Sequence, residues 1–227
     1  MLTTHTHLSF AGYRLHFIAF EPESLHARDL LWLPHHEKLH SWGRKRKAEH
    51  LAGRIAAVHA LRDYGVTRVP GIGDRRQPLW PPGLYGSISH CAKTAVAVVS
   101  DHPVGIDIET IFTRQTASEL ASSIIGNAEQ RLLEASPIAF PVALTLAFSA
   151  KESIYKACSE RFADLPGFHH TRLTAITGSQ ITLHVLPQFA AGLVNSTVHV
   201  CWMQRDQNVV TLCSPSSASL SKPPGSL

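Results

Sequence analysis

The sequence predicts an α+β fold made of two similar halves in a pseudo-two-fold arrangement, with the active site in the cleft between them. Two observations support this prediction. An amphipathic helix followed by a series of short strand-like segments occurs twice along the chain. The length of 227 residues and the hydrophobic content of 44% are sufficient for two small cores.

The first half contains a helix with clear apolar periodicity over Glu49–Tyr64. Leu51, Ile55, Val58 and Leu61 recur at helical spacing, and Gly65 is a typical helix stop. A loop rich in proline follows at residues 78–83. Segments rich in β-forming residues predict strands, namely Tyr13–Phe20, Tyr85–Ser89, Thr94–Ser100 and Val104–Glu109.

The second half repeats this order, with a predicted helix over Ala143–Arg161. The strands expected after it are Thr171–Ile176, Ile181–Val185, Thr197–Met203 and Val209–Leu212. A polar segment, Thr110–Ser118, is expected to link the halves. We therefore expect an N-terminal half over 1–110, a C-terminal half over 111–213 and a disordered Ser/Pro-rich tail over 214–227.

The charge is concentrated in the first third of the chain. The formal net charge is +4, and four cations are adjacent at Arg44–Lys47. Such a cluster indicates either an anionic ligand or a solvated basic face. No nucleic-acid motif supports a nucleic-acid partner, although the basic cluster leaves that alternative open.

The sequence also indicates where the protein is found. The first ten residues lack the features of a secretory signal, and no apolar segment is long enough for stable membrane insertion. The four cysteines form no C-x-x-C pair, so free thiols are expected. These features predict a cytoplasmic protein.

One short motif is typical of a different class, the zinc metalloproteases. His36-Glu37-Lys38-Leu39-His40 matches H-E-x-x-H, and the longer form of the pattern extends as far as Gly43. Arg46 then stands where a third histidine ligand is required. We therefore rank a protease well below the alternatives considered next.

Two carboxylates are expected to lie on one face of a strand. In Gly105-Ile106-Asp107-Ile108-Glu109, residues two positions apart point to the same side. Asp107 and Glu109 therefore present a pair of oxygen ligands of the kind that suits Mg²⁺. The alternative for this strand alone is a solvated acidic face.

Two further segments carry polar side chains of chemical interest. Glu152 and Lys156 are one helical turn apart, which by itself is also typical of a surface ion pair. Ser87 and Ser89 share a strand face, and His90 begins the loop after them. A hydroxyl and an imidazole there can donate hydrogen bonds to a phosphate.

The three segments, in this order, resemble the signatures of the 4'-phosphopantetheinyl transferase superfamily. The signatures are a serine–histidine segment, then G-I-D-I-E, then a helix of the form F-S-A-K-E-S-I-Y-K, here Phe148–Lys156. The segments RKAEHLAGRIAAVHAL and PLWPPGLYG are similar to the enterobactin synthetase component D branch of the Sfp-type monomeric class. The resemblance covers about half of the chain, roughly Ser41–Ala157.

The resemblance implies an enzyme that transfers the phosphopantetheine arm of coenzyme A to a serine of an apo carrier protein. It implies Mg²⁺ held by Asp107, Glu109 and Glu152, with Glu152 as general base and Lys156 stabilising the pyrophosphate. The expected coenzyme A contacts are Arg46, Lys47, Arg54, Arg76, Ser89 and His90, with Gln77 as the alternative to Arg76.

The same resemblance indicates the partner and the pathway. The carrier is expected to be a peptidyl or aryl carrier domain of a nonribosomal peptide synthetase, in siderophore synthesis, with fatty acid or polyketide carriers as the alternatives. It is expected to dock on residues 110–136. A monomer is expected because both halves of the cleft are in one chain. A coenzyme A or nucleotide-phosphate binding module without catalysis is the main alternative, although all three carboxylates and Lys156 are present.

Overall fold

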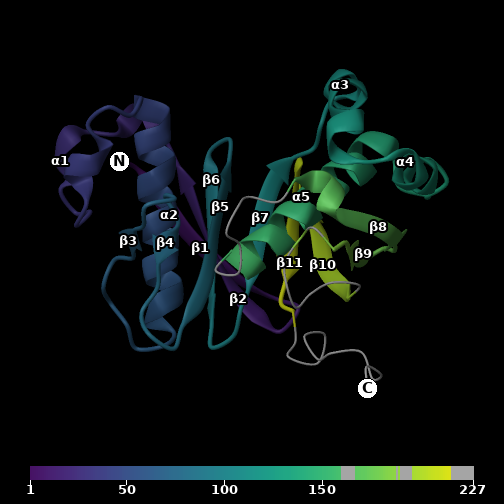
Figure 1. The fold of residues 1–227 in the computed structure, drawn as a ribbon. Helices are drawn as coiled ribbons and strands as arrows, with labels where there is room; N and C mark the ends of the chain where they lie inside the picture. The colour runs from purple at the N-terminus through teal and green to yellow at the C-terminus, as the bar shows by residue number, and fades with distance from the viewer. Residues whose placement is uncertain (160–166, 188, 190–195, 216–227) are drawn as a thin grey trace. The chain divides into compact units, whose positions relative to one another are not determined.

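The computed structural model describes residues 1–159, 167–187, 189 and 196–215 (Figure 1). The fold is mixed α+β, as the sequence predicts, and the chain separates into two compact units, Met1–Ile108 and Glu109–Leu227. The end of the predicted helix at Arg161 and residues 216–227 of the predicted tail lie outside the described residues.

The first unit contains a four-stranded sheet in the order β1-β2-β6-β5. All three pairings in it are antiparallel. Its strands are β1 (Thr3–Phe10), β2 (Tyr13–Phe20), β5 (Tyr85–Cys91) and β6 (Thr94–Ser100), and a separate small pair is formed by β3 (Gly71–Ile72) and β4 (Pro78–Leu79). The sequence analysis predicted β2 and β6 at these bounds but did not predict β1.

Helix α2 (Arg44–Arg62) packs on β2, β5 and β6 and forms the core of the first unit with them (Figure 1). Small residues allow this close packing: Ala52, Ala56 and Ala57 are fully buried. A Cβ atom at Gly53 would lie only 2.8 Å from Cγ2 of Ile88 on β5. The helix backbone therefore lies directly against this strand, where even a methyl group would force a shift.

The predicted start of this helix at Glu49 was wrong, because α2 begins five residues earlier. Arginine and lysine are good helix formers, so the run Arg44–Lys47 continues the helix although it lacks apolar periodicity. Gly43 occupies the N-cap position with an extended backbone. The basic run consequently lies on the first turn of a helix.

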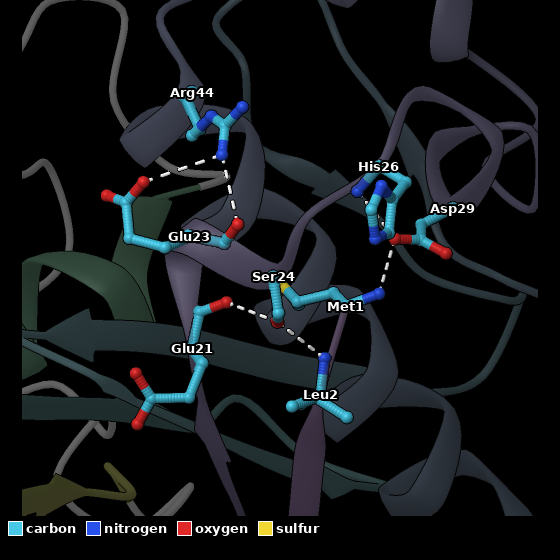
Figure 2. A network of polar contacts seen from close by, with 8 residues as sticks. All are labelled: Met1, Leu2, Glu21, Glu23, Ser24, His26, Asp29 and Arg44. Carbon is cyan, nitrogen blue, oxygen red and sulfur yellow. Dashed lines mark hydrogen bonds and ion pairs between the residues drawn. The ribbon is translucent and has the colours of Figure 1, made fainter.

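A network of polar contacts fixes the segment that leads to this helix (Figure 2). The ammonium group of Met1 forms an ion pair with Asp29, which also accepts a hydrogen bond from the amide of His26. Ser24 Oγ accepts from the Leu2 amide at 2.7 Å. Arg44 Nη1 donates to the Glu23 carbonyl at 3.0 Å. These bonds connect β1, η1 (Pro22–Ser24) and α1 (Ala27–Leu30) to the start of α2.

The second unit is built on a five-stranded sheet in the order β7-β11-β10-β9-β8. Its strands are β7 (Gly105–Thr110), β8 (Thr171–Ile176), β9 (Gln180–Val185), β10 (Thr197–Arg205) and β11 (Asn208–Cys213), and the division between the units falls within β7. Helix α5 (Phe140–Cys158) packs on β9, β10 and β11. Fully buried Leu144, Leu146 and Ile154 of α5 belong to this core.

The segment expected as a polar linker, Thr110–Ser118, contains the first residues of a helix. Helix α3 (Arg114–Ile124) begins after Thr113, whose hydroxyl accepts a hydrogen bond from the Thr116 amide at 3.1 Å. Helix α4 (Asn127–Glu134) follows, and both helices pack against α5. The helix was not visible in this segment because few of the apolar residues of α3 fall within 110–118. Ala117 is buried there, whereas Ala121 and Ile124 lie beyond it.

Candidate functional site

A cavity of about 580 Å³ opens beside the first half of α2. Residues of α2, of β5 and of the loop before β4 line it, and they are Trp42, Gly43, Lys45, Arg46, Glu49, His50, Gly53, Arg54, Arg76, Pro78, Ile88 and His90. Four of the predicted coenzyme A contacts, Arg46, Arg54, Arg76 and His90, are therefore brought to one cavity. The lining contains four permanent cations and one carboxylate, so the cavity favours an anion.

Two guanidinium groups stack on one aromatic ring at the edge of this cavity. The Cζ atom of Arg46 lies 4.4 Å from the centroid of Trp42, and that of Arg76 lies 5.6 Å from it. Cation–π stacking uses the face of a guanidinium and leaves its in-plane N–H groups to bind oxygen. Trp42 therefore places two cations at the edge of the same cavity. The sequence analysis did not predict Trp42, although an aromatic residue just before a basic run is a recognisable signal.

Arg54 is the most deeply buried of these cations, with 4% of its surface exposed. Its Nε and Nη2 atoms donate hydrogen bonds of 3.1 Å to the carbonyls of Pro70 and Gly71. Burial lowers the pKa of Arg54 to about 10, so the group stays charged at neutral pH. A buried cation with only neutral acceptors is a strong attractor for an anionic ligand.

His90 lies at the end of β5 and faces the single carboxylate of the cavity. Its Nδ1 atom is 4.0 Å from Oε2 of Glu49, whose other oxygen is 3.9 Å from Lys45 Nζ. His50 lines the same wall, and burial, helped by the positive charge of Arg54, lowers the pKa of His50 to about 3. His50 is therefore neutral at physiological pH. Glu49 and His50 were not predicted as part of the site.

Lys47 and Gln77, like Ser89 on β5, lie outside the cavity lining. Lys47 Nζ donates to the His40 carbonyl at 3.1 Å, which directs this side chain toward the start of α2. Gln77 accepts a hydrogen bond from the Arg75 amide at 3.0 Å through its side-chain oxygen. Its neighbour Arg76 lines the cavity, with a backbone φ of 65°. These contacts favour Arg76 over Gln77 as the ligand contact.

Strand β7 presents its first carboxylate beside the serine segment of β5. Asp107 is only 2% exposed, and Ser89 Oγ donates a hydrogen bond of 2.8 Å to its Oδ1 atom. Two residues earlier on β5, Ser87 Oγ accepts a 3.0 Å bond from the Ile106 amide. The two serines thus lie on the same side of β5, as predicted, and both contact β7. Glu109, two residues after Asp107 on β7, is half-buried.

Helix α5 carries the remaining candidates in the second unit. Glu152 and Lys156 are both half-buried. Glu152 lines a small cavity of about 200 Å³ with Lys151, Tyr155, Gly167, Phe168, Thr171 and Phe189. Glu152 therefore borders a hollow that also contains three aromatic side chains.

Lys151, next to Glu152, has a structural partner that the sequence did not indicate. Its Nζ atom lies 2.8 Å from Oε1 of Glu129 on α4, and the two side chains are 2% and 6% exposed. Lys151 also donates to the carbonyls of Ile124 and Phe168. Glu129 accepts from the amides of Gly126 and Leu173. This buried pair fixes α5 against α4 and β8, and it thereby sets the orientation of the helix that carries Glu152.

The H-E-x-x-H segment does not form the helix that a zinc protease requires. Residues His36–Leu39 form one turn of 3₁₀ helix, η2, and His36 Nδ1 lies 3.0 Å from the Leu33 carbonyl. Because residues four apart do not share a face in 3₁₀ geometry, His36 and His40 are not placed as a ligand pair. This supports the low rank given to the protease.

Family models match most of the chain. Residues 35–100 match the 4'-phosphopantetheinyl transferase N-terminal domain, and residues 103–213 match the 4'-phosphopantetheinyl transferase superfamily. The chain belongs to the 4'-phosphopantetheinyl transferase superfamily. It is therefore an enzyme of a family that uses coenzyme A as the donor of the phosphopantetheine arm, which confirms the resemblance.

Curated relatives place the chain more closely within this family. It is 61% identical to enterobactin synthase component D of Salmonella typhimurium strain LT2, over 94% of this chain and 91% of the relative. It is 52% identical to the protein of that name from Escherichia coli strain K12, over 94% and 98% of the two chains. The 4'-phosphopantetheinyl transferase PptT of Mycobacterium tuberculosis is 34% identical over 60% of this chain and 61% of its own length.

The described part of the chain contains no helix that is both long and apolar enough to cross a membrane.

Proposed function

We propose that this enzyme transfers the 4'-phosphopantetheine arm of coenzyme A to a serine of an apo peptidyl or aryl carrier domain of a nonribosomal peptide synthetase, in the synthesis of an enterobactin-like siderophore. The observation that carries the proposal is the cationic cavity beside α2, in a chain 61% identical to an enterobactin synthase component D. Family membership supports the reaction, and the relatives support the pathway.

The cavity is proposed to hold the phosphates of coenzyme A. Arg46 and Arg76, stacked on Trp42, are suited to bidentate contacts with a terminal phosphate such as the 3'-phosphate. Arg54 adds a desolvated charge at the cavity wall, and His90 adds a further donor when protonated. Lys47 and Ser89 remain proposed contacts, although each makes another hydrogen bond, Lys47 with a carbonyl and Ser89 with Asp107.

We assign a Mg²⁺ ion to Asp107, Glu109 and Glu152. The donor set fits this ion, because Mg²⁺ prefers carboxylate oxygens together with water and phosphate oxygens. Burial of Asp107 fits as well, since an ionised carboxylate is costly to bury unless a cation or hydrogen bonds compensate it. When bound, Mg²⁺ neutralises charge on the pyrophosphate of coenzyme A.

Two side chains of α5 are proposed to act in the transfer. One accepts the proton of the carrier serine, and the other stabilises the charge of the leaving group. Glu152 accepts the proton of the carrier serine, directly or through a water molecule, as the serine oxygen forms a bond to the phosphorus of the phosphopantetheine arm. The pyrophosphate bond then breaks, and 3',5'-ADP leaves with the bonding electrons. Lys156 stabilises the negative charge that develops on the pyrophosphate.

The carrier domain is proposed to dock on residues 110–136, which contain α3 and α4. This region offers an exposed apolar side chain, Leu120, which is 38% exposed. Basic surface near the cavity is expected to attract an acidic carrier and to make its capture sensitive to salt. We further propose a cytoplasmic monomer. None of the four cysteines, all of which the structure describes, forms a disulfide, consistent with a reducing compartment.

The transfer itself is tested with purified protein, coenzyme A, Mg²⁺ and an apo carrier domain of a nonribosomal peptide synthetase. We expect the intact mass of the carrier to increase by one phosphopantetheine arm. EDTA is expected to prevent the increase, and excess Mg²⁺ to restore it. An unmodified carrier, in a sample that binds coenzyme A normally, would instead identify a binding module without catalysis.

A further inference from the structure

Three histidines converge in the first unit, and none of them lines the cavity beside α2. His5 lies on β1, His16 on β2 and His59 on α2. Strand pairing places His7 opposite His16, so His5 is the diagonal neighbour of His16. Helix α2 packs on β2 and brings His59 to the same place. One ligand nitrogen from each of the three lies within 4.8 Å of the other two.

The spacing of these nitrogens approaches that of a metal site. His5 Nε2 and His16 Nδ1 are 3.0 Å apart. The rings of His5 and His59 are stacked, with centroids 3.6 Å apart and an interplanar angle of 10°. Two nitrogens bound to one tetrahedral Zn²⁺ at about 2.0–2.1 Å lie roughly 3.3 Å from each other. The His5–His16 separation is therefore close to that in a zinc site, and rotation of the stacked side chains would direct all three nitrogens at one ion.

A carboxylate fixes the orientation of the most buried of the three rings. His16 is 4% exposed, and its Nε2 atom lies 3.0 Å from Oδ2 of Asp63. When Nε2–H donates to this carboxylate, Nδ1 carries the lone pair that faces His5. Metal-binding histidines usually donate their second ring N–H to such a partner, which fixes the tautomer. Asp63 is itself held by Arg14, whose Nη1 atom is 3.4 Å from Oδ1.

The other two rings are also suited to bind a metal. The side chain of His59 makes no hydrogen bond to any described residue, so its ring nitrogens are available. Burial, reinforced by the charge of neighbouring His5, lowers the pKa of His59 to about 4. Burial also lowers the pKa of His5. Neutral imidazole is the form that binds a metal ion.

We propose that His5, His16 and His59 form a binding site for a divalent transition-metal ion, with Asp63 as the residue that orients His16. Imidazole ligands suit Zn²⁺, Cu²⁺ or Ni²⁺, whereas Mg²⁺ prefers oxygen, so this site is distinct from the proposed catalytic carboxylates. Water would complete the coordination. The ion would connect the edge strand β1 to α2, the helix whose first half lines the coenzyme A cavity.

Zinc binding to the untagged protein tests the proposal, because a histidine tag would itself bind the metal. The protein is treated with chelator, dialysed against Zn²⁺ in a buffer that contains Mg²⁺, and analysed for bound zinc and thermal midpoint. We expect one more zinc ion per chain in the wild type than in His59→Gln, and a Zn²⁺-dependent rise in Tm in the wild type alone. Asp63→Asn is expected to weaken zinc binding by about tenfold.

Two further variants make the test specific. His5→Gln changes a partly exposed residue on an edge strand and is expected to lose the same zinc ion even if His59→Gln folds poorly. His7→Gln is the matched control, because His7 stacks beside His5 but is outside the group of three. It is expected to bind zinc like the wild type. Equal zinc content in the wild type, His5→Gln and His59→Gln, or an equal loss in His7→Gln, would overturn the proposal.

Discussion

Ser89 Oγ donates a 2.8 Å hydrogen bond to Oδ1 of Asp107, and both side chains are buried in the first unit. This bond connects the serine–histidine segment of β5 with the acidic strand β7, which are two of the three segments that carry the family resemblance. Under the proposed function, Ser89 would therefore act on the metal site as well as on the phosphates assigned to it. It orients a carboxylate that is only 2% exposed.

The first prediction concerns this bond. Ser89→Ala removes a hydrogen bond to a charged group, worth about 1.5–3 kcal/mol. We expect the Mg²⁺ concentration that gives half-maximal transfer to rise by roughly tenfold or more, because Asp107 loses its orienting donor. A titration of Mg²⁺ at saturating coenzyme A measures the shift. Ser9→Ala, at an exposed position on β1, should leave the titration unchanged, and an unchanged titration for Ser89→Ala would separate this serine from the metal site.

A second prediction distinguishes which phosphate the stacked arginines bind. Arg46→Gln should weaken coenzyme A binding by about tenfold, the usual scale for loss of one charge-assisted contact. Binding of 3'-dephospho-coenzyme A should change little, because that ligand lacks the phosphate assigned to Arg46. Calorimetry with both ligands measures the difference.

Arg62→Gln provides the matched control for Arg46→Gln. Arg62 is an exposed cation at the other end of the same helix, outside the cavity lining. Its substitution is expected to leave the affinity for both ligands unchanged. An equal loss of affinity for the two ligands in Arg46→Gln would show that Arg46 contacts another part of coenzyme A.

The third prediction concerns the buried ion pair behind Glu152. Removal of one partner leaves an uncompensated buried charge, so Glu129→Gln should reduce the free energy of unfolding by about 3–5 kcal/mol. Lys151→Met combined with Glu129→Gln should recover part of this loss. Urea unfolding measures both values. Glu134→Gln, at an exposed position on the same helix α4, is the control, and a loss as small as that of the control would mean that the pair does not stabilise the unit.

The fourth prediction concerns the pH dependence of stability. His50 has a pKa of about 3 in the folded chain, against an ordinary value of 6.5. Between these values the unfolded chain binds a proton that the folded chain does not, so stability falls as the pH falls below about 6.5. Because His50 is only partly exposed, we expect it to reduce the free energy of unfolding at pH 5 by about 1–2 kcal/mol.

His50→Gln should reduce this pH dependence, while His40→Gln, at an exposed position, should not. Urea unfolding at pH 7 and pH 5 measures the difference in stability for each variant. His59 has a lowered pKa as well, so part of the dependence of stability on pH is expected to remain in His50→Gln. An identical slope in the wild type and His50→Gln would contradict the assignment of this proton to His50.

The sequence predicted the regular elements where apolar periodicity is strong and failed where other forces decide. Strands β2, β6 and β8 have the predicted bounds, because their apolar and β-branched residues mark them clearly. Strand β1 was missed because its Thr/His pattern has little apolar alternation, and its pairing with β2 makes it a strand. The start of α2 was missed because the first turn is basic and largely exposed.

The residues of the candidate site were likewise predicted only in part. Motifs identified the acidic strand and the helix that carries Glu152, because their residues are adjacent in the chain. Trp42 was missed although it directly precedes the basic run. His50 was missed because only the folding of α2 against the loop before β4 places it beside Arg54 and Arg76. The three-histidine cluster was missed for a related reason, since its members come from three elements and no local motif joins them.

The central claim is that Asp107, Glu109 and Glu152 support transfer through one Mg²⁺ ion while the cationic cavity binds coenzyme A independently. Intact-mass analysis of the carrier, with calorimetry of coenzyme A binding in Asp107→Ala and Glu152→Ala, tests it most directly. We predict that both variants lose transfer at any Mg²⁺ concentration and keep part of the coenzyme A affinity. Transfer at the wild-type rate in either variant would contradict the account.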